Sequence, residues 1–514
     1  MIEIIVNGKR YSFPEGRWSL ADLLWSAGYE IPLPCAGLGN CGKCQIKVRG
    51  DVEILDSDRK LIPPHRLSEG YLLACRVRKL RGSVEVELPN VERRKKIEIE
   101  EVKVERVNAG VDLGTTSIVV NFSPVERGRV FYSSSSLNPQ TRYGADVISR
   151  VTYIGGDNSR LQKMRQGVVE YLNGEIESVR EAIGFKKVEL VGVAGNSIME
   201  HIFLNLDPSP LTRFPFTLSF KDGVFKRGEE LGISAEKVFI FPLVGAYVGG
   251  DTVALLMDLE PLKKPARRVI VDIGTNGEIV VQNGENLFAT AAAAGPAFEG
   301  GNITFGMRAE NGAIERFWME DDRLKYRTIG NLPPEGICGS GLMDLIAVLT
   351  EEGVVDENGA IRDPMEIDSP LFSRVKEKNG ERIFLVYRDV KREIYVTQKD
   401  IREFQLAKGA IRAGMEVLLK KAELSWQDID EVIIAGAFGS YLMPDSLISV
   451  GMFPEDVRNR IVFTGDAVIR GVNKVLGRDL FDEANRMARK VKYVELSLEE
   501  GFQEIFLSSL SFRR

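Results

Sequence analysis

The stretch Val111-Asp112-Leu113-Gly114-Thr115-Thr116 recurs 160 positions later as Val271-Asp272-Ile273-Gly274-Thr275-Asn276. In each copy an apolar strand runs into one acidic residue and a tight turn of glycine and small polar residues. A second strand follows each turn, at 117–121 and at 278–282. Apolar strands alternate with helical stretches from residue 107 onward, which predicts an α/β fold. We expect two similar halves, at roughly 107–265 and 266–514, with a site between them.

Both turns suit phosphate binding. Small residues let backbone N–H groups approach phosphate oxygens, and threonine hydroxyls add donors. The two aspartates can hold a hydrated Mg²⁺, because that ion prefers oxygen ligands and keeps several waters, and one of them can position an attacking water. One such turn alone is more often a bare hairpin than a phosphate site, so the prediction depends on both copies. We expect catalytic roles for Asp112 and Asp272 and nucleotide contacts from Gly114, Thr115, Thr116, Gly274, Thr275 and Asn276.

A third glycine-rich segment is Val432-Ile433-Ile434-Ala435-Gly436-Ala437-Phe438-Gly439-Ser440. It is typical of a buried strand that runs into small residues, where the backbone can lie against a planar base. By itself it is equally consistent with an ordinary strand-to-helix turn. No G-x-x-x-x-G-K-[ST] segment is present, which excludes the P-loop class. Two phosphate motifs and an adenosine motif in this order resemble the ATPase superfamily of actin, heat-shock chaperones and sugar kinases (ASKHA). The resemblance implies nucleotide contacts from Gly436, Ala437, Phe438 and Gly439.

Four of the five cysteines, Cys35, Cys41, Cys44 and Cys75, lie within the first 75 residues. Their spacing is close to that of plant-type ferredoxins, C-x4-C-x2-C with a distant fourth cysteine, with one extra residue in the first gap as in adrenodoxin-like proteins. Three thiolates on one loop and a fourth from another segment can enclose a 2Fe–2S cluster. Glycines at 37, 39 and 42 let the loop turn tightly and direct backbone N–H groups at sulfur.

Two other metal centres fit these cysteines less well. A zinc site with four thiolates normally shows two short C-x2-C pairs, and only one is present here. A Rieske centre needs two histidines, but the chain has only His65 and His201, of which only His65 is near. We therefore expect a β-grasp-like 2Fe–2S ferredoxin domain at 1–90, with a hairpin at Asn7-Gly8 and a helix capped by Ser19. A charged linker is expected at 91–106.

Composition narrows the class of protein. The chain has 514 residues, 44% of them apolar, which is typical of a folded protein of several domains. The balance of 68 Lys+Arg against 74 Asp+Glu argues against a nucleic-acid binder. No apolar run reaches the roughly 18 residues of a membrane span, and no signal peptide is evident at the N-terminus. We expect a cytoplasmic protein.

Together the ferredoxin domain and the nucleotide motifs resemble the reductive activators of corrinoid proteins over nearly the whole chain. The resemblance also rests on segments 195–201, 248–251, 295–301, 336–341, 397–401, 405–408 and 435–439. It implies an ATPase that passes one electron from its 2Fe–2S cluster to Co(II) and so regenerates Co(I). The coupling to ATP is reasonable, since each ~59 mV of uphill one-electron gap costs a factor of ten. The implied partners are the corrinoid protein of a methyltransferase system and a low-potential electron donor.

Some features leave alternatives open. The segment joining the ferredoxin domain to the ATPase part is shorter than in some relatives, so a homodimer is left open. Asp466 stands where that family leads us to expect asparagine. Activators of 2-hydroxyacyl-CoA dehydratases hold a cluster with thiols of the ATPase domain, but Cys338 is the one cysteine here, and we expect it to be a packing residue. The alternative functions are a non-catalytic redox-sensing nucleotide-binding protein, an activator of another metalloenzyme, and a sugar or acid kinase.

Overall fold

The computed structural model describes residues 2–13, 19–27, 29, 31, 42, 44–76, 80–88, 104–126, 129–274, 276–390, 392–436 and 442–512. Several predictions fall on positions outside these residues, namely those for Cys35, Gly37, Gly39, Cys41, Thr275, Ala437, Phe438, Gly439 and most of the linker at 91–106. The chain forms two compact units, Met1–Ser219 with Phe225–Phe239, and Phe220–Val224 with Ile240–Arg514. Among the described residues, no helix combines the length and apolarity that crossing a bilayer requires.

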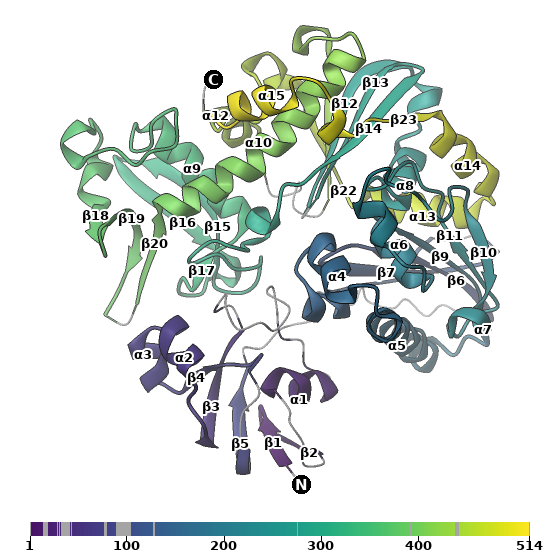
Figure 1. Ribbon diagram of the computed structural model, residues 1–514, viewed down its shortest axis with the longest axis horizontal. Coiled ribbons are helices and arrows are strands. Elements are labelled where there is room, and N and C mark those ends of the chain that lie inside the picture. The colour runs from purple at the N-terminus through teal and green to yellow at the C-terminus, as the bar shows by residue number, and fades with distance from the viewer. Residues whose placement is uncertain are drawn as a thin grey trace. The chain divides into compact units, whose positions relative to one another are not determined.

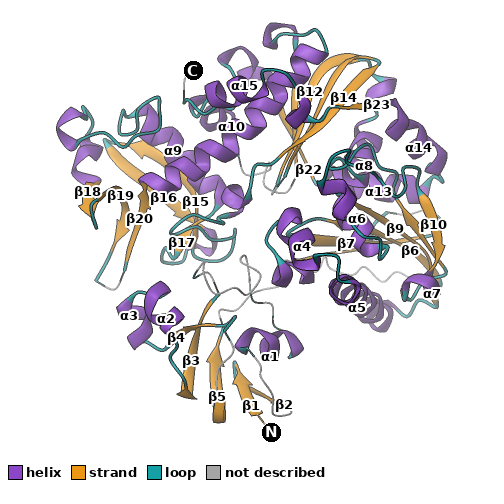
Figure 2. Ribbon diagram, viewed as in Figure 1, coloured by secondary structure: helices purple, strands orange, loops and turns teal. Residues whose placement is uncertain are grey.

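The first unit begins with a five-stranded mixed sheet in the order β2-β1-β5-β3-β4 (Figure 2). This is the β-grasp order, with antiparallel β1 and β2 and parallel β1 and β5. Asn7 and Gly8, with φ of 46° and 84°, form the predicted hairpin turn, since a two-residue turn of this kind needs positive φ at both positions. Its elements are β1 (Ile2–Val6), β2 (Lys9–Phe13), α1 (Leu20–Ser26), β3 (Gln45–Val52), α2 (Asp56–Leu61), α3 (Pro64–Ser68), β4 (Tyr71–Leu73) and β5 (Leu80–Glu87).

The start of α1 is stabilised as its sequence predicts. The Ser19 hydroxyl accepts from the Asp22 backbone N–H at 3.0 Å, and the Asp22 carboxylate accepts from the Ser19 backbone N–H at 3.2 Å. This reciprocal pair satisfies two N–H groups that have no partner inside the helix. The apolar face that follows, with Leu23 and Leu24 fully buried, packs into the core of the sheet with Ile4 and Val84.

The second sheet of the first unit has six strands in the order β10-β11-β9-β6-β7-β8. β6 lies in its interior, antiparallel to β7 and parallel to β9. β6 begins at Arg106, the last residue of the predicted linker. The elements are β6 (Arg106–Leu113), β7 (Ser117–Pro124), β8 (Tyr132–Leu137), η1 (Pro139–Tyr143), α4 (Val147–Ile154), α5 (Asn158–Ile183), β9 (Lys187–Gly195), α6 (Ser197–Phe203), η2 (Ser209–Thr212), β10 (Val224–Arg227), α7 (Gly228–Leu231) and β11 (Lys237–Ile240).

The second unit is built on a six-stranded sheet in the order β22-β21-β12-β13-β14-β23. β12 is antiparallel to β13 and parallel to β21, which repeats the pairing of β6 with β7 and β9. The internal repeat in the sequence therefore corresponds to two sheets of like topology. The elements of this sheet and its helices are α8 (Gly250–Leu259), η3 (Pro261–Lys263), β12 (Ala266–Ile273), β13 (Gly277–Gly284), β14 (Asn286–Ala292), η4 (Pro296–Glu299), α10 (Gln398–Lys421), η8 (Trp426–Asp428), β21 (Glu431–Ala435), α12 (Pro444–Ser449), η9 (Glu455–Arg460), β22 (Ile461–Gly465), α13 (Ala467–Gly477), α14 (Phe481–Lys490), β23 (Val491–Tyr493), η10 (Leu496–Leu498) and α15 (Phe502–Ser509).

Two three-stranded sheets complete the second unit, in the orders β16-β15-β17 and β18-β19-β20. α9 packs on β15 at close range, because a Cβ at Gly341 would lie 2.2 Å from the Ile314 carbonyl oxygen. Figure 1 shows α15 beside the long helix α10. The elements are β15 (Ala313–Glu320), β16 (Arg323–Thr328), η5 (Ile329–Asn331), β17 (Gly336–Ile337), α9 (Gly339–Glu351), η6 (Pro364–Glu366), η7 (Pro370–Arg374), β18 (Val375–Lys378), β19 (Glu381–Arg388) and β20 (Glu393–Thr397).

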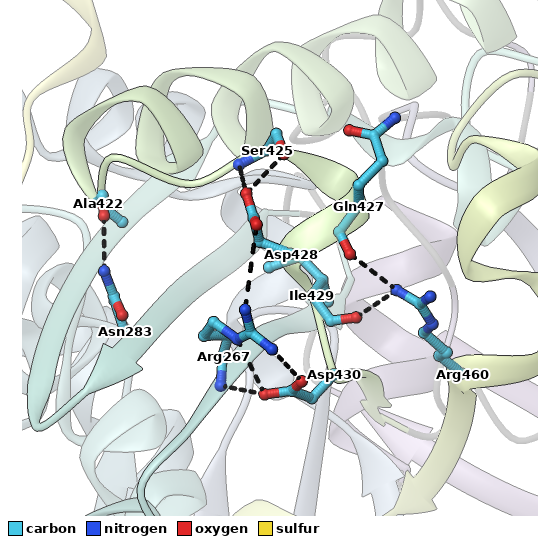
Figure 3. A network of polar contacts seen from close by, with 9 residues as sticks. All are labelled: Arg267, Asn283, Ala422, Ser425, Gln427, Asp428, Ile429, Asp430 and Arg460. Atoms are coloured by element: carbon cyan, nitrogen blue, oxygen red, sulfur yellow. Dashed lines mark hydrogen bonds and ion pairs between the residues drawn. The ribbon is translucent and has the colours of Figure 1, made fainter.

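A polar network holds β12 and β21 in register at the end where both strands begin (Figure 3). Nη2 of Arg267 donates to the Asp430 carboxylate at 2.7 Å, and the Asp430 backbone N–H donates to the Arg267 carbonyl at 2.8 Å. Arg460 donates from Nη1 to the Ile429 carbonyl at 2.6 Å, which ties in the start of β22. The pairing continues to the far end of the strands, where Asp272 stands opposite Ala435.

Candidate functional site

The two described cysteines of the predicted cluster lie at the meeting ends of two strands. Cys44 precedes β3 and Cys75 follows β4, and the antiparallel register sets Gln45 opposite Leu73. The Ala74 backbone N–H donates to the Cys44 carbonyl at 2.8 Å, so the pairing continues up to the cysteines. Both cysteines are buried. Residues 31 positions apart in the sequence are thus neighbours in space, as closure of a cluster by a distant fourth thiolate requires.

Gly42 is the described glycine of the cysteine loop. Its φ is +69°, and a Cβ there would lie 3.3 Å from the Leu61 carbonyl oxygen. Both features favour glycine, since residues with a side chain rarely adopt this backbone conformation. The described part of the iron–sulfur site therefore fits the predicted group, with two buried thiols beside the ends of paired strands and a glycine in a backbone conformation that favours glycine.

The first acid–glycine turn connects β6 to β7 in the first unit. Asp112 stands opposite Val119 on β7 and Ala194 on β9. A Cβ at Gly114 would lie 2.6 Å from the Ser117 carbonyl oxygen, and one at Gly195 would lie 2.7 Å from the Leu113 carbonyl oxygen. A side chain at Gly114, which follows β6, or at Gly195, the last residue of β9, would therefore collide with the backbone.

The second acid–glycine turn connects β12 to β13 in the second unit. The Gly274 backbone N–H donates to the Asn276 carbonyl at 3.0 Å and closes the turn. Gly436 follows β21 directly, with φ +85°, and a Cβ there would lie 2.4 Å from Oδ1 of Asp272. The structure thus brings the predicted acid and the first glycine of the predicted adenosine segment into contact, although 164 positions separate them in the sequence.

Two further acids face Asp272 and received no role in the sequence analysis. Asp251 lies in the first turn of α8, and Asp466 directly precedes α13. Burial raises the pKa of the Asp272 carboxyl to about 7, and the negative charges of Asp251 and Asp466 act in the same direction. Burial likewise raises the pKa of Asp251 to about 6. Each acid directly follows a glycine, Gly250 or Gly465, but this spacing alone does not show that the two acids converge on Asp272.

Close packing of two helices brings these acids together. A Cβ at Gly471 on α13 would lie 1.8 Å from the Ala254 carbonyl oxygen on α8, so the two helices touch backbone to backbone. Within the described ranges, no three His, Cys, Asp or Glu side chains are close enough to hold a metal ion by themselves. Mg²⁺ in nucleotide sites usually takes only one or two carboxylates and completes its shell with water and phosphate. The carboxylates at Asp272 and its two acidic neighbours are oxygen ligands of the type that such an ion takes.

The polar residues of the motif around 397–408 have structural partners. Oδ1 of Asp400 accepts from the Thr304 backbone N–H at 2.7 Å, and Gln405 donates to the Leu510 carbonyl at 3.0 Å. Lys408, fully buried, donates from Nζ to the carbonyl groups of Ser509 and Ser511 at 2.7 and 2.6 Å. These side chains join α10 to the loop at 304 and to the C-terminal segment.

His201 and Cys338 are packing residues. Nδ1 of His201 donates to the Ser197 carbonyl at 2.7 Å, while Nε2 accepts from the Ser219 backbone N–H at 3.1 Å, so the neutral ring has both nitrogens engaged. Cys338 is buried with its sulfur 3.4 Å from the Ile314 carbonyl oxygen. These contacts agree with the expectation that Cys338 is a packing residue.

Three family models match the chain. Residues 4–79 match a 2Fe-2S iron-sulfur cluster binding domain, residues 107–263 match the RACo middle region, and residues 267–514 match the C-terminal domain of RACo, the ASKHA domain. The predicted fold class, a ferredoxin domain followed by an ASKHA domain, is confirmed.

Known proteins are similar to most of the chain. The corrinoid activation enzyme RamQ of Eubacterium limosum is 34% identical over 413 residues, which cover 78% of this chain and 69% of RamQ. The [Co(II) methylated amine-specific corrinoid protein] reductase of Methanosarcina barkeri is 24% identical over 378 residues, 66% of each chain. The solved structure of a reductive activator for corrinoid, iron-sulfur protein aligns with a TM-score of 0.71 at 27% identity, covering 99% of this chain and 98% of that one.

Proposed function

The chain belongs to the RACo family of corrinoid activators, and from this premise we propose that it reactivates a corrinoid protein at the expense of ATP. One electron passes from a reduced 2Fe–2S cluster to Co(II) of the partner's corrinoid, which becomes Co(I), and the cluster is oxidised by one electron. ATP is hydrolysed to make the uphill transfer possible.

The iron–sulfur domain is the electron carrier in this proposal. Cys35, Cys41, Cys44 and Cys75 hold the cluster, and the adjacency of buried Cys44 and Cys75 at the ends of β3 and β4 supports the assignment. The cluster, when bound, accepts and releases one electron. The chain's own contribution is to keep two thiols in place beside the ends of two paired strands and to shield them from water.

The ASKHA part binds ATP and Mg²⁺ in this proposal. Asp112 and Asp272 serve the bound Mg²⁺ and the attacking water, and the turns that follow them hold the phosphates. Gly436, against Asp272, lets the adenosine segment approach the second turn. We assign Asp251 and Asp466 to the water shell of the cation, because their negative charges help to raise the pKa of the Asp272 carboxyl. The first half of the ATPase part is assigned to 107–265 and the second to 266–514.

The proposed partners follow from the same premise. They are the corrinoid protein of a methyltransferase system and a low-potential electron donor to the cluster, in the cytoplasm. Whether two copies of the chain act together is decided by measurement of the molar mass of the reconstituted protein in solution.

One observation carries the proposal: a single chain contains the iron–sulfur domain and the ASKHA domain in the order of the solved activator, aligned over 99% of its length. The test is to mix the reduced protein with a Co(II) corrinoid protein and ATP under anaerobic conditions and to follow the Co(I) absorbance. We expect a Co(I) signal with ATP and none with ADP.

Two controls make the result specific. Cys41→Ala should abolish the Co(I) signal, because it removes a cluster ligand, while it should preserve ATP binding. ATPase activity that rises when the corrinoid protein is added distinguishes an activator from a redox sensor. No ATP-dependent Co(I) with any corrinoid protein tested would refute the function.

A further inference from the structure

Two side chains outside the sequence motifs donate hydrogen bonds to the carbonyl groups of the first acid–glycine turn. Nδ2 of Asn138 donates to the Gly114 carbonyl at 2.7 Å, and the Asn138 backbone N–H donates to the Thr116 carbonyl at 2.9 Å. The Thr115 carbonyl between them accepts a hydrogen bond from Nη2 of Arg150. Three consecutive carbonyl groups of the turn are therefore engaged by two residues.

Both residues are themselves fixed in orientation and fully buried. Oδ1 of Asn138 caps η1 by accepting from the Gln140 backbone N–H at 2.9 Å. Arg150 donates from Nε to the Gly144 carbonyl at 3.1 Å and from Nη1 to Oε1 of Gln140 at 3.4 Å. Because the guanidinium is planar, these contacts together with Thr115 set its orientation completely.

The orientation of the carbonyl groups determines that of the N–H groups. In a trans peptide the C=O of one residue and the N–H of the next point in opposite directions. With the Gly114 and Thr115 carbonyls turned toward Asn138 and Arg150, the N–H groups of Thr115 and Thr116 are turned to the opposite side of the turn. Successive N–H groups presented in this way form an anion-binding surface.

We propose that Arg150 and Asn138 are positioning residues that direct the backbone N–H groups of the first turn at the phosphates of the nucleotide. This inference rests on the proposed function, since it concerns the same ATP site. Arg150 also places a positive charge directly behind the Thr115 carbonyl, which favours an anion on the other side of that peptide. Its effect should therefore increase with the number of phosphate groups on the ligand.

The test uses the full chain with its cluster reconstituted and compares Arg150→Met with Arg165→Met. Arg165 lies in the same unit and likewise donates to two carbonyl groups, those of Phe203 and Leu231 at 2.9 and 2.6 Å, but it does not contact the turn. The dissociation constants of Mg–ATP and Mg–ADP are measured by calorimetry, and kcat and KM for ATP by phosphate release. Urea unfolding records the stability of each variant.

We expect Arg150→Met to weaken ATP binding tenfold or more, ADP binding less, and to raise KM for ATP more than it lowers kcat. Arg150→Lys, which keeps the charge but not the planar fork, should fall between the parent and Arg150→Met. Arg165→Met should bind ATP within twofold of the parent even where its stability is equally reduced. If Arg150 only packs, Arg150→Met and Arg165→Met should bind ATP with the same affinity.

Asn138→Ser keeps the test decisive where Arg150→Met does not fold. Serine can still cap η1 but is too short to reach the Gly114 carbonyl. We expect at least threefold weaker ATP binding with little loss of stability. Equal ATP affinity of Arg150→Met and Arg165→Met, or unchanged affinity in Asn138→Ser, overturns the inference and leaves the proposed function standing. A parent chain that binds no ATP overturns both.

Discussion

Oδ1 of Asp272 lies only 2.4 Å from the position that a Cβ at residue 436 would take, which leaves no room for any residue but Gly436. The end of β12 and the end of β21 are therefore in contact through one carboxylate and one bare backbone. This contact joins the acid of the second turn to the segment predicted to hold adenosine.

Gly436→Ala should reduce ATPase activity at least tenfold, because the new methyl group displaces the Asp272 carboxylate. The substitution also places alanine at φ +85°, which costs about 1–2 kcal/mol of stability. The measurement is phosphate release at saturating ATP, together with urea unfolding.

Gly501→Ala is the matched control for that substitution. Gly501 has φ +76° and nothing within 4 Å of its Cβ position, so it reports the cost of the backbone conformation alone. We expect a similar loss of stability with ATPase activity within twofold of the parent. Equal activity of the two alanine variants would show that the Asp272 contact is unimportant.

The charge of Asp272 should make the stability of the nucleotide-free protein depend on pH. Its pKa is raised from 3.8 to about 7 in the folded chain, so the folded state binds more protons than the unfolded state between these values. The free energy of unfolding therefore falls as pH rises from about 4 to 7. Asp272→Asn should remove this loss and be more stable than the parent at pH 8 by roughly 1–3 kcal/mol.

Urea unfolding at pH 5 and pH 8, without nucleotide or Mg²⁺, measures the effect. The exposed Asp482→Asn serves as a control and should leave the pH dependence of the parent unchanged. A stability difference between Asp272→Asn and the parent that is the same at both pH values would contradict the assignment. Adding Mg–ATP at pH 8 should stabilise the parent more than Asp272→Asn, since the carboxylate is then compensated.

Cluster assembly should require the four N-terminal cysteines but not Cys338. Cys44→Ala and Cys75→Ala each remove a thiol at the paired ends of β3 and β4, so the reconstituted variants should lose the 2Fe–2S absorption and EPR signals. Cys338→Ala should retain both, because its sulfur packs against the Ile314 carbonyl in the ASKHA part. Iron and sulfide content per chain gives the quantitative comparison, and a full cluster in Cys75→Ala would exclude that residue as a ligand.

Lys408 should make stability depend on pH in the opposite direction. Burial lowers its pKa from 10.5 to about 7, so the unfolded chain binds more protons between these values, and the free energy of unfolding rises with pH over that range. Lys408→Met should lack this rise and, by leaving the Ser509 and Ser511 carbonyls without their donor, loosen the C-terminal segment.

The comparison for Lys408 is urea unfolding at pH 7 and pH 9. Between these pH values, we expect the free energy of unfolding of the parent to rise by on the order of 1 kcal/mol or more relative to that of Lys408→Met. Lys399→Met, at an exposed position of the same helix, should behave as the parent does. Identical pH dependence in Lys408→Met and the parent would show that the lysine is not titrated in this range.

Much of the fold could be predicted because it depends on short-range patterns. The turn residues Asn7 and Gly8, the Ser19–Asp22 cap and the repeated acid–glycine turns act over two to six positions, and each forms the element expected of it. The two halves share a strand order because the repeat places the same strand-turn-strand unit at the start of each. The predicted roles of Asp112 and of the turn residues stay predictions, as do those on positions outside the described part of the chain.

What the amino-acid order determines by itself here is therefore the kind of chemistry: the cysteine spacing of an iron–sulfur centre, and the turns of a nucleotide-binding ATPase. Only the tertiary structure decided which residues meet. Strand register places Cys44 beside Cys75, the contact of α8 with α13 sets Asp251 and Asp466 around Asp272, and Asn138 and Arg150 reach the turn at 114–116 from a separate segment. The physical reason is that spacing controls neighbours within a few residues, whereas contacts between distant segments depend on how strands pair and helices pack.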